Sequence, residues 1–186
     1  MKANFSRCME HVFAFEGGLV NNKDDPGGLT NMGISQRSYP KEDIRNMTKA
    51  RAAAIYRRDY WDAVRGDDLP AGLDLVAFDA AVNSGVSRGA KWLQTALGAE
   101  ADGKIGPVTL ARASVAPIPA TIERAIDLRM GFLRGLKNWR TFGKGWQRRV
   151  DAVEVLALDM ASQPTPEPSG GFWAALVAML LAFFRK

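Results

Sequence analysis

The sequence predicts a mainly α-helical globule with a small irregular or β lobe near residues 19–34 and a separate apolar helix at the C-terminus. Three observations lead to this prediction. Apolar residues recur at spacings of three and four through most of the chain, as expected for helices that bury one face. Residues 13–35 interrupt this pattern with many Gly, Asn, Asp and Pro residues, which favour turns. A run of thirteen apolar residues, Phe172 to Phe184, follows a linker rich in proline and glycine.

Length and composition limit the possible functions. A chain of 186 residues, 47% of them hydrophobic, is long enough for one core and a small appended unit. The net charge of +5 predicts attraction to a polyanion such as nucleic acid, an anionic membrane or the bacterial wall. No nucleic-acid-binding motif stands out, so we expect no nucleic-acid partner. Cys8 and His11 are the only residues of their types, which argues against disulfides, zinc sites and cysteine or serine catalytic triads. We expect no cofactor and no metal, and we expect His11 on the surface.

Glu16 is the first candidate for catalysis. It follows the apolar stripe of a predicted first helix, formed by residues such as Phe5, Met9 and Val12. Partial desolvation at such a place raises the pKa of a carboxylate, which suits a general acid. Asp25 lies across the turn-rich loop, and a hairpin would return it to face Glu16. Two carboxylates in different environments suit glycoside hydrolysis, although each is also consistent with a structural role at a helix end or turn.

The order of these residues resembles a known family. The segment begins with E-G-G at Glu16, continues with eight residues between Glu16 and Asp25, and ends with P-G-G-x-T-x-x-G-I-S. This order resembles the signature of glycoside hydrolase family 108, the N-acetylmuramidases of phage endolysins and secretion systems. The resemblance implies a lysozyme-like fold, cleavage of the β-1,4 bond between N-acetylmuramic acid and N-acetylglucosamine, and Glu16 as catalytic acid. Similarity to the Glu-Asp-Thr arrangement of phage lysozymes implies that Asp25 and Thr30 position water. Met32 departs from the family, which usually carries an aromatic or longer polar residue there.

An aromatic cluster follows on a helix predicted from Thr48 to Val64, with Thr48 as its N-cap. Tyr56, Tyr60 and Trp61 either pack in the core or form a wall for sugars, because flat ring faces match the C–H faces of sugars. The same Y-x-x-x-Y-W stretch occurs in the family. We therefore expect Tyr60 and Trp61 to bind substrate.

A small-residue helix is predicted from Pro70 to a glycine cap at Gly85. Its F-D-x-A-V-N-S-G stretch also resembles the muramidase family. Asp79 and Asn83 are four residues apart and share one face of this helix. They either contact the substrate or belong to a capping or hydrogen-bond network, and both are candidate substrate-binding residues.

The second half of the chain is predicted to be helical over 87–97, from 107, over 118–139 and over 146–160. The D-G-x-x-G-x-x-T pattern that begins at Asp102 resembles small peptidoglycan-binding modules, the third type of which follows family 108 catalytic regions. We expect Asp102, Gly103 and Gly106 to be scaffold residues. The resemblance implies a catalytic region at 1–95 and a peptidoglycan-binding-like helical region at 96–162 packed on it.

Basic residues dominate the end of this region. Eight Lys or Arg residues lie between Glu123 and Arg149 against two acidic ones, and Arg148 and Arg149 are predicted to point outward. Such an excess favours attraction to an anionic wall, although a charge run is more often simply a solvated face.

The tail is expected to be a separate unit, with a linker at 163–171 and an apolar segment at 172–186. Thirteen apolar residues form a helix of about 20 Å, too short for a hydrocarbon core of about 30 Å, so residues 172–184 are expected to associate with the inner membrane. The N-terminus lacks the apolar run of a secretory signal. We expect a monomer made in the cytoplasm that reaches the periplasm or wall with the help of a holin.

Two other functions remain open from the sequence. A lytic transglycosylase needs only one catalytic carboxylate and acts on the same glycan. A non-enzymatic wall-binding or secretion-accessory protein would use the basic face and the glycine-rich module for binding alone.

Overall fold

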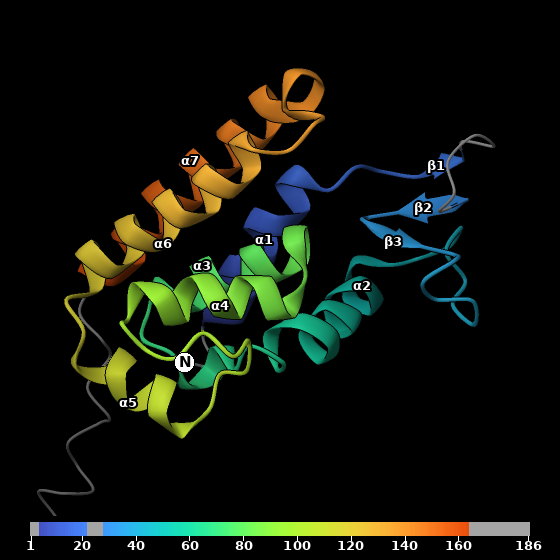
Figure 1. The fold of residues 1–186 in the computed structure, drawn as a ribbon. Helices are drawn as coiled ribbons and strands as arrows, with labels where there is room; N and C mark the ends of the chain where they lie inside the picture. The colour runs from blue at the N-terminus through green and yellow to red at the C-terminus, as the bar shows by residue number, and fades with distance from the viewer. Residues whose placement is uncertain (1–3, 22–27, 164–186) are drawn as a thin grey trace, which may run out of the picture.

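The computed structural model describes residues 4–21 and 28–163 (Figure 1). Helices dominate it, as the sequence predicts, and a small sheet lies beside them. In chain order the elements are α1 (Asn4–Phe15), β1 (Val20–Asn21), β2 (Leu29–Asn31), β3 (Ile34–Ser35), α2 (Lys49–Tyr56), the π-helix η1 (Arg57–Trp61), the 3-10 helix η2 (Gly66–Asp68), α3 (Leu73–Ser84), α4 (Val86–Ala96), α5 (Pro107–Val115), α6 (Ile118–Arg134) and α7 (Trp139–Ser162).

Helix α3 is the centre of the fold. Every residue from Leu73 to Ala81 is buried, as expected for a helix that is covered on all sides. It contacts α1, α4, α6 and α7. Gly89 lets α4 approach closely, because a Cβ there would lie 2.8 Å from the backbone nitrogen of Ala81. Buried residues on both sides of the boundary predicted at residue 95 join in one hydrophobic core, and the division into two regions stays a prediction.

The lobe is a three-stranded antiparallel sheet in the order β1-β2-β3. Thr30 lies opposite Val20 on one side and Ser35 on the other. The two-residue turn between β2 and β3 consists of Met32 and Gly33, with φ values of 49° and 75°. Two positive φ values match the right-handed twist of a tight hairpin. The positive φ costs conformational free energy at Met32, because Met32 has a Cβ. The lobe predicted near residues 19–34 is thus confirmed.

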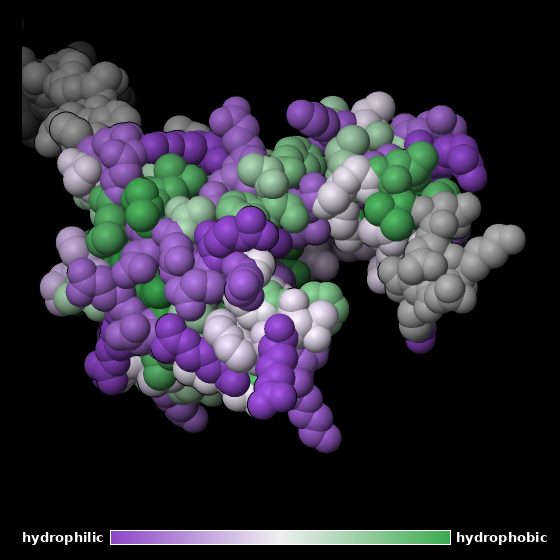
Figure 2. All heavy atoms as spheres, turned by 90° about the horizontal axis from the view of Figure 1, so that it is seen from above, coloured by the Kyte–Doolittle hydropathy of each residue, from purple (hydrophilic) through white to green (hydrophobic). Residues whose placement is uncertain are grey.

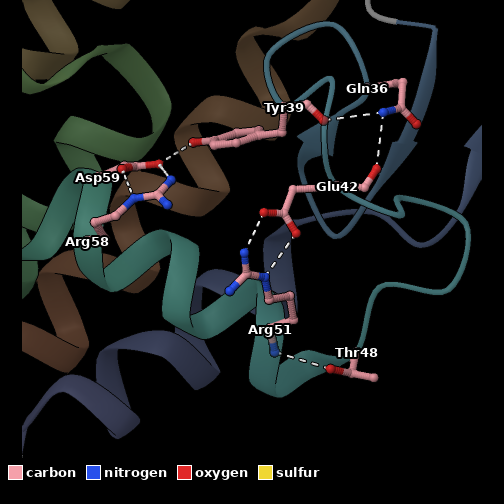
Figure 3. A network of polar contacts seen from close by, with 7 residues as sticks. All are labelled: Gln36, Tyr39, Glu42, Thr48, Arg51, Arg58 and Asp59. Carbon is pink, nitrogen blue, oxygen red and sulfur yellow. Dashed lines mark hydrogen bonds and ion pairs between the residues drawn. The ribbon is translucent and has the colours of Figure 1, made fainter.

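The loop that follows the sheet is fastened to α2 and η1 (Figure 3). Gln36 donates to the backbone carbonyls of Tyr39 and Glu42 at 3.2 and 3.1 Å. Arg51 on α2 donates through Nε to the Glu42 carboxylate at 2.9 Å, and the Tyr39 hydroxyl donates to Asp59 at 2.8 Å. These bonds fix the orientation of the lobe on the helical body. In Figure 2 the lobe stands to the right of the body and meets it along a narrower waist.

Several predicted helix boundaries need correction. Thr48 caps α2 as expected, with its hydroxyl accepting from the Arg51 N–H at 3.2 Å. Pro70 does not begin α3, because Gly72 has a φ of 89° that is incompatible with a helix, and α3 starts at Leu73. The predicted helix over 118–139 ends at Arg134, where Gly135 is the C-cap, and α7 begins at Trp139 rather than at 146.

The glycine-rich turn after α4 is organised by a buried glutamine. Gln94 donates to the Asp102 carboxylate at 2.7 Å and to the Lys104 carbonyl at 3.0 Å, and it accepts from the Gly103 N–H at 2.9 Å. Asp102 and Gly103 are therefore scaffold residues, as the sequence analysis expects.

The predicted apolar tail lies outside the described residues, as does most of the linker before it. Within residues 4–21 and 28–163, no helix has the length and apolar character needed to cross a membrane.

Candidate active site

Glu16 lies where the helical body meets the lobe. Its N–H donates to the Val12 carbonyl at 3.0 Å, so it continues the last turn of α1 before the chain leaves through Gly17. The Met32 N–H donates to the Gly17 carbonyl at 3.1 Å, which joins the β2–β3 turn to the end of α1. The Glu16 side chain keeps 18% of its surface exposed. It is therefore held by its surroundings and still open to a ligand.

Arg149 on α7 holds the Glu16 carboxylate. Its Nη1 donates to Oε1 of Glu16 at 2.9 Å, and its Nε donates to Oδ1 of Asp79 at 2.8 Å. The other Asp79 oxygen accepts from Nη1 of Arg129 at 2.7 Å, and Arg129 also donates to Asn83 at 3.2 Å. We call Glu16, Arg149, Asp79 and Arg129 the ion network. It links α1, α3, α6 and α7.

Most of the ion network is shielded from solvent. Asp79 has no exposed side-chain surface, and Arg129 and Arg149 are 2% and 8% exposed. Burial by itself would raise the pKa of Asp79, but the guanidinium groups of Arg129 and Arg149 outweigh it and hold that pKa below its ordinary range. Asp79 is thus a buried anion between two buried cations. With Glu16 ionised, the four charges balance.

His11 borders the ion network, which corrects the prediction that it lies on the surface. Its side chain is 7% exposed, and its Nε2 lies 3.8 Å from Oδ1 of Asp79. Its ring centroid is 5.0 Å from that of Phe15. Burial lowers the pKa of His11 below its ordinary value, against the opposing effect of Asp79. The first helix brings His11 inward because it packs against α3 on a wider face than its apolar stripe predicts.

The β2–β3 turn touches the other side of the Glu16 carboxylate. A Cβ added at Gly33 would overlap Oε2 of Glu16 and the hydroxyl of Tyr56, so only glycine leaves room for both groups. The Tyr56 hydroxyl donates to the Met32 carbonyl at 3.0 Å, and burial, with the Glu16 charge as a second cause, raises the pKa of Tyr56. Tyr56 therefore remains a neutral donor that fixes the turn against Glu16.

The predicted substrate-binding residues fall into two groups. Trp61 has no exposed surface, and its ring packs against Phe5 and Phe78 at 5.3 Å from each, so the expectation that it binds sugar is wrong and the alternative of a core role is correct. Asp79 is likewise too buried for a substrate contact and belongs to the ion network. Tyr60 is half-buried with its ring 5.6 Å from that of Tyr56, and its role stays a prediction.

The structure bears differently on the three remaining candidate site residues. Asn83 is half-buried and accepts a hydrogen bond from Arg129, so it takes part in the network that the sequence offered as one of its two roles. Thr30 lies on β2, two residues before the turn that touches Glu16, and its role in positioning water stays a prediction. Asp25 lies outside the described residues.

Sequence reasoning missed the arginines. Arg149 is buried, which corrects the prediction that it points outward as part of a basic run. A signal for its true direction exists, because Arg149 precedes Val153 by four residues and Ala157 by eight and so falls on the apolar stripe of α7. Arg129 similarly precedes Leu133 by one turn on α6.

Among the described residues, Glu16 supplies this site with a partly exposed carboxylate that can transfer a proton. Within the part of the chain that the structure describes, no group of three or more His, Cys, Asp or Glu side chains is arranged to hold a metal ion. A helical body with a small sheet, and a glutamate at their junction, define the class of lysozyme-like glycoside hydrolases.

Comparison with known proteins narrows this class. A model of the family glycosyl hydrolase 108 matches residues 9–85. Among solved structures, the chain is similar to Brucella abortus SagA, with a TM-score of 0.79 and 41% sequence identity over 88% of this chain and 98% of that one. No curated protein matches the sequence. The chain belongs to glycosyl hydrolase family 108, and it is therefore a glycoside hydrolase of the peptidoglycan-degrading type.

Replacing Asp79 by asparagine tests the ion network. The change keeps the size of the side chain but removes the charge between two buried guanidinium groups, which costs about 3–5 kcal/mol of unfolding free energy. In the folded fraction Arg149 loses its fixed direction, so kcat for the release of soluble peptidoglycan fragments falls more than KM rises. Urea unfolding and turbidity assays measure the two effects.

Asp74→Asn is the matched control. Asp74 lies on the same helix with no exposed surface, but its partners are Asn4 and the N–H groups of Gly72 and Leu75. Its variant is expected to lose stability and to retain the kcat of the folded enzyme. Equal kcat losses in both variants would show that Asp79 has no special connection with Glu16.

The lowered pKa of His11 makes the free energy of unfolding depend on pH. Its pKa is lowered in the folded protein from 6.5, so below about pH 6.5 the unfolded chain binds more protons than the folded one. The free energy of unfolding therefore falls as the pH is lowered through this value and is unaffected by His11 at higher pH. Urea midpoints from about pH 5 to 8 should show a smaller decline in His11→Gln than in the wild type. Parallel curves would contradict the assignment.

Proposed function

We propose that this protein is an N-acetylmuramidase, which hydrolyses the β-1,4 bond between N-acetylmuramic acid and N-acetylglucosamine in peptidoglycan. Membership of family 108 supports the class of reaction. The observation that carries the proposal is the Glu16 carboxylate, which is bonded to Arg149 through one oxygen and still 18% exposed at the junction of body and lobe. This is the combination that a general acid needs: a fixed direction and access to the substrate.

In the proposed mechanism, protonated Glu16 donates its proton to the glycosidic oxygen as the bond to the anomeric carbon breaks. Water adds to that carbon, and Asp25 and Thr30 position it, with Asp25 also stabilising positive charge on the sugar. The water releases a proton as it adds, and Glu16 takes up a proton before the next turnover, so hydrolysis consumes one water molecule and no net proton. Arg149 occupies Oε1 of Glu16, so Oε2, which lies beside Gly33, is the oxygen proposed to carry the proton. Tyr60 and Asn83 are proposed to contact the sugars that flank the bond.

The cellular role is proposed to be lysis or remodelling of the bacterial wall. The protein would be made in the cytoplasm, would pass to the periplasm through a holin or a similar route, and would act there as a monomer. The net charge of +5 supports an anionic polymer as its target. Residues 96–162 are proposed to add affinity for peptidoglycan to the activity of residues 1–95.

The first test compares the products of the wild type and Glu16→Gln on purified Gram-negative peptidoglycan. Mass spectrometry of the soluble fragments is expected to find reducing-end muramic acid for the wild type, and about a hundredfold to ten-thousandfold less for the variant, because an amide does not act as a general acid. Circular dichroism controls for folding.

Other products would favour the other functions. Anhydro-muramic ends from the wild type would identify a lytic transglycosylase. No soluble fragments from either protein, with retained binding to the wall, would favour a wall-binding or secretion-accessory protein and overturn the proposal.

The tail at 172–186 is proposed to hold the enzyme at the inner membrane. Its thirteen apolar residues and its final Arg185 and Lys186 support this role. A chain ending at residue 163 should retain full activity on purified peptidoglycan and lose its co-sedimentation with inner-membrane vesicles. Unfolding of the shortened chain would instead make the tail part of the core.

A further inference from the structure

The first turns of α7 carry three aromatic side chains in a row. The ring centroids of Trp139 and Trp146 are 6.2 Å apart, and those of Trp146 and Phe142 are 5.9 Å apart. Phe142 is 52% exposed, and the two tryptophans are half-buried. We call these three residues the aromatic row. It offers flat apolar surface to solvent at the end of the α6–α7 pair, the uppermost part of Figure 1.

The aromatic row lies on the same helix as Arg149, which bonds the candidate acid. Phe142 precedes Arg149 by seven residues, so the two lie on the same face of α7 about 10.5 Å apart along its axis. Trp146 lies between them on this face. Arg149 bonds to Glu16, and its guanidinium lies 5.7 Å from the ring centroid of Phe15, which is 38% exposed. Trp146 and Phe142 therefore lie within about two helical turns of the arginine that bonds the candidate acid.

A basic hollow adjoins the aromatic row. It has a volume of about 720 Å³ and is lined by Trp139, Arg140, Gly143, Lys144, Gln147 and Arg148. Its floor is apolar, because the Trp139 indole packs on Gly143, where a Cβ would lie 2.6 Å from the ring. Its rim carries the exposed charges of three basic side chains. The hollow thus suits a ligand that combines flat apolar faces with negative charge.

We propose that the aromatic row and this hollow bind the glycan strand of the substrate beyond the bond that is cleaved. Sugar rings stack on Phe142 and Trp146, because the C–H faces of sugars match aromatic faces. Carboxylates of the stem peptides pair with Arg140, Lys144 and Arg148. The inference rests on the proposed function, and it assigns to α7 the sugar-stacking surface that buried Trp61 does not provide.

An anionic bilayer is the other partner that aromatic and basic side chains attract. One observation favours the glycan. The row lies within about two helical turns of Arg149, which bonds the Glu16 carboxylate that the substrate of this enzyme must reach.

The test measures binding in the Glu16→Gln background, where turnover is strongly slowed. Phe142→Ala and Trp146→Ala are each expected to weaken binding of long, peptide-bearing glycan strands about threefold to tenfold by calorimetry. Binding of short fragments that cover only the cleaved bond should be unchanged. Trp92→Ala is the matched control, because Trp92 lies on α4 with its ring 5.5 Å from Phe132, outside the aromatic row. The affinity of the Trp92→Ala variant for long strands and for short fragments should equal that of Glu16→Gln alone.

A separate binding experiment tests the basic side chains at the rim of the hollow. Arg148→Ala and Lys144→Ala should weaken binding of peptide-bearing strands and leave unchanged the binding of strands from which an amidase has removed the peptides. Thermal unfolding checks that all variants are folded.

Two results would overturn the inference: unchanged affinity for long strands in both aromatic variants, or a loss of binding to phosphatidylglycerol vesicles with glycan binding intact. Failure of the proposed function looks different. It would appear as wild-type protein that binds long strands through Phe142 and releases no fragments.

Discussion

The buried contact between Asp79 and two guanidinium groups is the interaction on which the candidate site depends. Two cations that are almost entirely buried require a counter-charge, and Asp79 supplies it with one oxygen for each. Because Asp79 fixes Nε of Arg149, Nη1 of Arg149 has a defined direction and donates a hydrogen bond to the Glu16 carboxylate. A surface arginine would lack this restriction and would contribute little to the geometry of a carboxylate. Helix α3 thus sets the direction of a side chain on α1 through a side chain on α7.

The lobe completes the arrangement from the opposite side. The turn of Met32 and Gly33 reaches Glu16 because Gly33 has no side chain, and Met32 adopts a φ of 49° to form it. Tyr56 ties this turn to α2, and the contacts of Tyr39 and Glu42 hold the following loop (Figure 3). Glu16 is therefore confined by helices on one side and by a turn on the other. One part of its side chain remains exposed for a substrate.

Much of the fold could be predicted from local pattern, whereas the ion network could not. The apolar stripe of α1 predicted that Glu16 follows the first helix, and the turn residues after it predicted the lobe. Arg149 was missed because its partners lie 133 and 70 residues away and because Arg148 beside it is exposed. Trp61 was misjudged because residues 57–61 form a π-helix, in which the Asp62 N–H bonds to the Arg57 carbonyl and the side chains turn from their α-helical directions.

A crystal structure of Glu16→Gln with a bound glycan strand would show whether position 16 faces the bond that is cleaved. We expect the glycosidic oxygen within about 2.6–3.2 Å of the side chain at position 16. We also expect Arg149 to remain bonded to Asp79 and sugars farther along the strand to lie over Trp146 and Phe142. A strand bound with no sugar in contact with position 16 would contradict the assignment of this site.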